Sequence, residues 1–216
     1  MEKKRAKKNR KTRLENIYAL FPEIMEIQEA SLREKVARVW LAAARASAFR
    51  IEEAPNLPSH GYPAPGHSHP EMARYKLTDH IRLVVLLSKD IAKRLKEIFA
   101  LEINLDILLA SALIHDADKM VFYAHKGQEV VISDMGKKIP HGFFAAKWAV
   151  DNKLPIEVVN AVFSHSGRAS IFPKTLEGLV VLYADLVAAD ALRMVSGAKG
   201  ILETYKHFGP AHLTHP

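Results

Sequence analysis

Apolar residues recur at helical spacing along most of the chain and predict an all-α fold. One stripe runs through residues 31–50, and a second runs from Thr78, the expected N-cap, to about Leu101. A β-branched run, Val130 to Ile132, lies in the irregular segment 121–139 and predicts a short strand or hairpin arm. The pattern elsewhere favours a single-domain helical bundle with an N-terminal helical extension.

A nearly uninterrupted apolar run occupies residues 107–114 and ends in the adjacent pair His115 and Asp116. Such a run predicts a helix buried on most sides, with Asn104 as its N-cap. A buried carboxylate without a partner costs several kcal/mol, so Asp116 needs a cation, a hydrogen-bond network or water. A divalent metal ion would meet this need most simply.

Three later helices carry further polar residues at unusual positions. His141 lies beside the start of a helix opened by a proline, and His165 lies near the end of the next helix. A long helix from Thr175 to Val195 has Asp185 in the middle of an apolar stretch. A carboxylate there requires a partner for the same reason as Asp116.

Breaks in the pattern suggest how the chain is divided. Residues 52–71 are rich in proline and glycine and predict a long loop that forms a lid or pocket wall. Its histidines, His60, His67 and His69, are interpreted as loop residues rather than tight metal ligands. The predicted parts are a basic tail (1–13), N-terminal helices with the loop (14–71), the metal-binding helical domain (72–200) and a C-terminal tail (201–216).

The formal net charge of +7 belongs to the first thirteen residues, which hold eight lysines and arginines against Glu2. The tail could touch nucleic acid or acidic lipid headgroups, but it lacks interleaved aromatic residues, and we interpret it as solvated. The chain has no cysteine, which excludes disulfides, thiolate metal sites and a cysteine nucleophile. No apolar run reaches membrane-spanning length and no signal peptide is recognisable, so the expected compartment is the cytoplasm.

The unusual polar residues of the helices form one candidate set of metal ligands. They are His80, His115, Asp116, His141, His165 and Asp185. Imidazole and carboxylate ligands suit zinc, manganese, iron, nickel or cobalt, and they disfavour the all-oxygen sites of calcium and magnesium. Each residue taken alone has a simpler interpretation as a hydrogen-bonded core residue.

The order of these residues resembles the HD superfamily, the helical metal-dependent phosphohydrolases named for the adjacent His-Asp pair. The resemblance covers about Lys76 to Ser196 and is carried by three motifs: Thr-Asp-His80, His115-Asp116-Ala-Asp-Lys119 and Tyr-Ala-Asp185. It implies that His80, His115, Asp116 and Asp185 bind a first metal ion. It also implies that His141 and His165 bind a second, with Asp116 bridging the two.

The resemblance further implies hydrolysis of a phosphomonoester or phosphodiester, such as a nucleotide, by a metal-bound hydroxide. Lys119 matches a family lysine that faces the site, although Ala117-Asp118 replaces the usual x-Gly before it. Asp118 has two interpretations, a general acid and a solvated carboxylate. Arg168 is expected either to hold a substrate phosphate or to lie on the surface of a glycine turn.

Two other functions stay open on the sequence. Some relatives with this six-ligand set hold two irons and use dioxygen, so the chain could be an oxygenase. A regulatory protein that keeps the metal and has lost catalysis is the other possibility. The sequence does not determine the substrate, the metal or the oligomeric state.

Overall fold

The computed structural model describes residues 14–59, 74–166 and 171–204. Residues 14–20 are helical and lead into the elements that follow. In chain order these are η1 (Pro22–Glu26), α2 (Ala30–Ala46), η2 (Ile51–Asn56), α3 (Leu77–Phe99), α4 (Leu105–Ile114), α5 (Lys119–Phe122), β1 (Tyr123–Lys126), β2 (Glu129–Ile132), α6 (Asp134–Lys138), α7 (Phe143–Asp151), α8 (Ile156–Ser164), α9 (Leu176–Val195) and α10 (Ile201–Thr204). The predicted all-α fold is confirmed.

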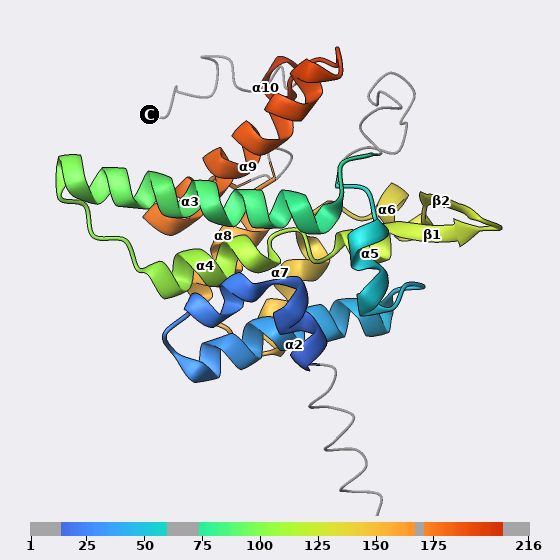
Figure 1. Ribbon diagram of the computed structural model, residues 1–216, viewed down its shortest axis with the longest axis horizontal. Helices are drawn as coiled ribbons and strands as arrows, with labels where there is room; N and C mark the ends of the chain where they lie inside the picture. The colour runs from blue at the N-terminus through green and yellow to red at the C-terminus, as the bar shows by residue number, and fades with distance from the viewer. Residues whose placement is uncertain (1–13, 60–73, 167–170, 205–216) are drawn as a thin grey trace, which may run out of the picture.

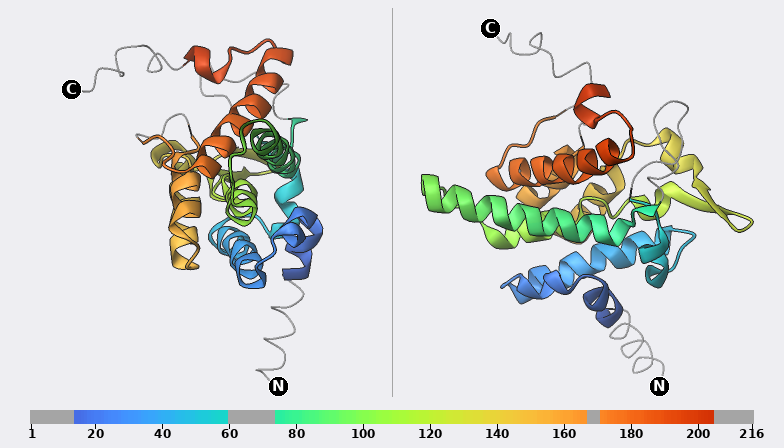
Figure 2. Two further views of the ribbon diagram at one scale, coloured as in Figure 1. Left: turned by 90° about the vertical axis from the view of Figure 1, so that its left-hand side faces the viewer. Right: turned by 45° about the horizontal axis from the view of Figure 1, so that its top comes forward.

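Helix α4 forms the centre of the bundle. It packs against α2, α3, α8 and α9, which surround it in the left view of Figure 2. All eight residues of Ile107–Ile114 are buried, because neighbours cover every side of this helix. The sequence has no amphipathic stripe here for the same reason. The end of α4 therefore lies deep within the fold, where the chain places His115 and Asp116.

The N-terminal helices are attached to α4 at both of its ends. At its start, the Asp106 carboxylate accepts hydrogen bonds from the backbone N–H groups of Gln28 and Glu29, at 2.7 and 2.8 Å. At its end, the buried indole of Trp40 donates from Nε1 to the Leu113 carbonyl at 3.0 Å. This bond satisfies one of the carbonyls that the last turn of a helix leaves unpaired.

The predicted helix caps have mixed outcomes. Asn104 accepts from the N–H groups of Asp106 and Ile107, and Thr175 accepts from that of Gly178, so both of these caps are confirmed. The prediction for Thr78 is wrong: α3 begins at Leu77 after Lys76, and Thr78 is buried in the first turn. Burial of its side chain against the core takes the place of capping.

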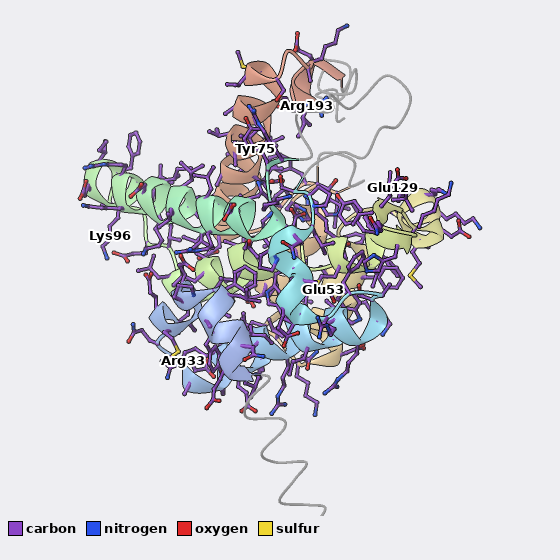
Figure 3. All side chains as sticks on the ribbon, turned by 45° about the vertical axis from the view of Figure 1, so that its right-hand side comes forward. Arg33, Glu53, Tyr75, Lys96, Glu129 and Arg193 are labelled. Atoms are coloured by element: carbon purple, nitrogen blue, oxygen red, sulfur yellow. The ribbon has the colours of Figure 1, made fainter. Side chains whose placement is uncertain are left out.

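The strand signal corresponds to a hairpin in which β1 and β2 pair antiparallel, with Tyr123 opposite Ile132. The hairpin projects from the bundle (Figure 1). Figure 3 shows Glu129, in β2, on the opposite side of the molecule from Lys96 in α3. Among the described residues, no helix has the length and apolar character needed to cross a membrane.

Candidate metal centre

The His-Asp pair lies immediately after α4, in a tight turn that leads to α5. The backbone turns through hydrogen bonds from Ala117 N to Ile114 O and from Lys119 N to Asp116 O, both 3.0 Å. His115, Asp116 and Asp118 are all buried in this turn. The turn therefore directs two carboxylates and one imidazole into the interior, where water cannot satisfy them.

One oxygen of Asp116 faces a first group of side chains from α3, α4 and α9. Its Oδ2 lies 3.2 Å from His80 Nε2 and 3.4 Å from His115 Nε2. Asp185 Oδ1 lies 3.0 Å from His80 Nε2 and 3.8 Å from His115 Nε2. These four side chains come from three helices and converge on one small volume.

The other oxygen of Asp116 faces a second group. Its Oδ1 lies 2.6 Å from His141 Nε2, in the turn before α7, and 3.6 Å from His165 Nε2, at the end of α8. The two imidazole nitrogens are 3.1 Å apart. Asp116 thus stands between two groups of histidines and presents one oxygen to each.

Two of the imidazoles are oriented by the helices that they end. His115 Nδ1 lies 2.8 Å from the Ala112 carbonyl, and His165 Nδ1 lies 2.6 Å from the Val162 carbonyl. Because a carbonyl only accepts, these nitrogens carry the proton and donate it. The Nε2 atom of each ring is then left with a lone pair directed at the cluster, as a metal ligand requires.

The carboxylates dominate the electrostatics of the centre. Burial alone raises the pKa of Asp116, but Lys119 and the surrounding histidines outweigh it and hold that pKa well below its usual value. Asp185 also has a lowered pKa, since His80 and His115 outweigh its burial. Burial lowers the pKa of His80, but the carboxylates of Asp116 and Asp185 raise it above its usual value. In the metal-free centre, positive charge is therefore strongly favoured beside these two carboxylates.

The two histidines of the second group have pKa values shifted in opposite directions. Burial lowers the pKa of His141, yet the carboxylates of Asp118 and Asp116 raise it to about 10. Burial lowers the pKa of His165, and its interaction with Asp116 does not reverse the effect. His165 is therefore already in the neutral form that binds metal near pH 7, whereas His141 must release a proton.

The donor atoms fit divalent metal ions. Three sets of ligand atoms each lie within 4.8 Å of one another: His80 with His115 and Asp116, His115 with His165 and Asp185, and Asp116 with His141 and His165. Asp116 Oδ1 is buried and has no well-aligned hydrogen bond from a described residue, even though His141 Nε2 is only 2.6 Å away. Once His141 has released its proton, a divalent cation would satisfy the lone pairs that converge here.

Lys119 and Asp118, next to the pair, have separate partners. Lys119 Nζ contacts Asp116 Oδ2 and donates to the Ser59 carbonyl at 2.6 Å. Asp118 contacts His141 and Gly142 instead of Lys119. The interpretation of Asp118 as a solvated carboxylate is wrong, because its side chain is fully buried. No local signal in the sequence distinguishes Asp118 from a surface carboxylate, because residues 115–119 are all polar except Ala117.

The structure brings together all six candidate ligands and Lys119. Arg168 lies outside the described residues, as do the loop histidines His60, His67 and His69. The predicted basic tail and most of the C-terminal tail also lie outside them. The roles proposed for those residues stay predictions.

Comparison with known proteins connects this arrangement to one family. The family model described as HD domain matches residues 77–190, which is more than half of the chain. A dihydroneopterin 2',3'-cyclic phosphate phosphodiesterase from Methanocaldococcus jannaschii is 31% identical over 110 residues. That similarity covers 50% of this chain and 44% of the relative, so the chain spans less than half of the relative's length. No solved structure gives a significant match.

Proposed function

The chain belongs to the HD domain family, as the order of its histidines and aspartates predicted, and from this premise we propose that it is a metal-dependent phosphohydrolase. The proposed reaction is hydrolysis of a phosphoester bond, with a phosphodiester as the preferred substrate. The observation that supports it most strongly is the position of Asp116, whose two oxygens face two separate groups of ligands.

The ligands are divided between two ions according to which oxygen of Asp116 they lie near. His80, His115 and Asp185 would hold the first ion together with Asp116 Oδ2. His141 and His165 would hold the second together with Asp116 Oδ1. Manganese, iron, cobalt, nickel and zinc all accept such nitrogen and oxygen ligands. Two bound ions would supply activation of water near neutral pH and charge stabilisation of the phosphoryl oxygens.

Lys119 contributes the positive charge that lies closest to Asp116 among the described residues. Its ammonium group is held between Asp116 Oδ2 and the Ser59 carbonyl, and its side chain is 13% exposed. A phosphate bound beside Asp116 would be attracted by this charge, because few waters screen it. We assign Lys119 the role of positioning the substrate phosphate, and Arg168, three residues after His165, a second phosphate contact.

The substrate class follows from the relative. That protein is named as a phosphodiesterase of dihydroneopterin 2',3'-cyclic phosphate. We therefore propose a small cyclic or nucleotide phosphodiester as the substrate of this chain and two divalent transition-metal ions as its cofactors. Hydrolysis opens one P–O ester bond, adds the elements of water and leaves a phosphomonoester and a free hydroxyl.

The test is a hydrolysis assay with metal-free protein reconstituted with Mn²⁺, Fe²⁺, Co²⁺, Ni²⁺ or Zn²⁺. The substrates are bis(p-nitrophenyl) phosphate, p-nitrophenyl phosphate and 2',3'-cyclic nucleotides. We expect metal-dependent turnover, faster on the diesters, that falls at least 100-fold in Asp116→Asn. Asp90→Asn, the same change at an exposed position of α3, serves as the control and should keep wild-type activity.

Two results would refute the proposal. One is hydrolysis that is equally fast with and without metal, and the other is equal loss in the two variants. Metal-dependent oxygen consumption with two bound irons and no hydrolysis would move the chain to the oxygenase alternative.

A further inference from the structure

Asp118 is a buried carboxylate that the proposed ligand assignment leaves without a role. It lies in the turn between α4 and α5, its side chain is fully buried, and each of its oxygens lies close to a nitrogen atom. Oδ2 accepts a hydrogen bond from Gly142 N at 2.7 Å. Oδ1 lies 3.1 Å from His141 Nδ1, within reach of a hydrogen bond, although the two atoms are not aligned for one in the metal-free structure. A buried negative charge is costly, so this arrangement needs an explanation.

The position of His141 in the fold provides one. His115 and His165 each follow a helix and use a carbonyl of that helix to fix Nδ1. His141 instead lies in the turn between α6 and α7, and no helix carbonyl of a described residue accepts a hydrogen bond from its Nδ1. The Asp118 carboxylate lies at this same nitrogen, and the opposite nitrogen of the ring, Nε2, lies 2.6 Å from Asp116 Oδ1.

The second oxygen of Asp118 fixes the backbone next to this ring. Gly142 has φ 88°, a conformation that favours glycine. A Cβ atom there would lie 3.1 Å from the Val162 carbonyl and 3.4 Å from His165 Cε1. The start of α7 thus lies against the end of α8, and Asp118 is hydrogen-bonded to the backbone of this junction and lies beside its imidazole.

We propose that Asp118 is the positioning residue of the second metal ion: it keeps the proton of His141 on Nδ1 and aims Nε2 at the ion. This inference rests on the proposed two-ion centre. Hydrogen bonds to the outer nitrogen of a ligating histidine fix its tautomer and orientation, and their loss typically costs 10- to 100-fold in metal affinity. Asp118 acts through His141 and does not contact the ion.

Asp118→Asn tests the proposal because the amide has nearly the same shape and a different hydrogen-bonding capacity. An amide has one accepting oxygen and one donating nitrogen, so it cannot accept from both Gly142 and His141. If its oxygen stays on Gly142, its NH₂ group faces His141 Nδ1 and favours the tautomer with the proton on Nε2. That tautomer has no lone pair to offer the ion.

The measurement is calorimetric titration of the metal-free protein with Mn²⁺, which gives a stoichiometry and an affinity for each site. We expect two ions in the wild type and in the control Asp90→Asn. In Asp118→Asn we expect an unchanged first site and a second site weakened about 10- to 100-fold. Asp118→Ser, with a shorter side chain that also lacks the carboxylate, should give the same result and replaces the Asn variant if that protein does not fold.

A double-mutant cycle separates positioning of His141 from general damage. In the His141→Gln background, Asp118→Asn should weaken the second site no further, because the ring through which it acts is gone. Additive losses, equal weakening of both sites, or unchanged affinity in Asp118→Asn would each overturn the role of Asp118. Binding of a single Mn²⁺ ion by the wild type would instead overturn the two-ion centre itself.

Discussion

The hydrogen bond from Trp40 to the Leu113 carbonyl joins α2 to the end of α4, the helix that the His-Asp pair follows. Removing this bond tests how strongly α2 stabilises that end. In Trp40→Phe the ring remains aromatic and can still stack on Phe21, whose ring centroid is 4.6 Å away. The Leu113 carbonyl loses its indole partner inside the core. A buried polar group without a partner costs about 1–3 kcal/mol, and the lost ring volume adds about 1 kcal/mol.

Trp40→Phe should therefore lower the free energy of unfolding by about 2–4 kcal/mol, a large part of the 5–15 kcal/mol typical of a domain. Trp148→Phe is the matched control. Trp148 is also buried and stacks on Phe144, but no described residue accepts a hydrogen bond from its indole N–H. Trp148→Phe should lower the free energy of unfolding only by the cost of the lost ring volume, about 1 kcal/mol.

Urea denaturation followed by circular dichroism measures both variants under the same conditions, with the metal-free protein so that binding does not contribute. We expect Trp40→Phe to be less stable than Trp148→Phe by about 1–3 kcal/mol. Equal losses in the two variants would refute the claim that this hydrogen bond supports the end of α4.

Three further predictions concern the metal ions and the junction of α7 with α8. Adding Mn²⁺ to chelator-treated protein should raise its thermal midpoint as the Mn²⁺ concentration increases. Each site should add about 4 kcal/mol to the free energy of unfolding when free Mn²⁺ is at 1,000 times the Kd of that site, and a constant midpoint would contradict this. Mn²⁺ affinity should rise between pH 6.5 and 9 in calorimetric titrations, because the pKa of His141 near 10 means that metal must displace a proton; pH-independent affinity would argue against it. In urea denaturation, Gly142→Ala should lower the free energy of unfolding by more than Gly127→Ala does. Both glycines have positive φ, but a Cβ at Gly127 would meet no atom within 4 Å, whereas one at Gly142 would meet residues at the end of α8. Equal losses would show that the contacts with α8 are unimportant.

Much of the fold could be predicted from the spacing of apolar residues, because each long helix buries a recognisable face or lies wholly inside. The apolar run before His115 identified the central helix, and Asn104 identified its start. The β-branched run of Val130–Ile132 identified the hairpin. The cap at Thr78 could not be predicted, since whether a threonine caps or packs depends on the residues that cover it.

The sequence also identified the polar residues that meet in the centre, because buried histidines and carboxylates on apolar helices need partners. The division of Asp116 between two groups was implied by the resemblance to the HD superfamily and not by the spacing of the residues, since it depends on how α3, α8 and α9 are placed around α4. Nor could the sequence separate Asp118 from a surface carboxylate: residues 115–119 are all polar except Ala117, and the turn before α7 reaches Asp118 only in the folded chain. The hydrogen bond of Trp40 joins residues 73 positions apart and had no local signal.

The central claim is that Asp116 bridges two metal ions. The most direct test is a crystal structure of the protein loaded with Mn²⁺, with anomalous data collected to locate the ions. Two anomalous peaks are predicted, one beside Asp116 Oδ2 with His80, His115 and Asp185, and one beside Oδ1 with His141 and His165. A single peak, or two peaks that do not share Asp116, would contradict the account.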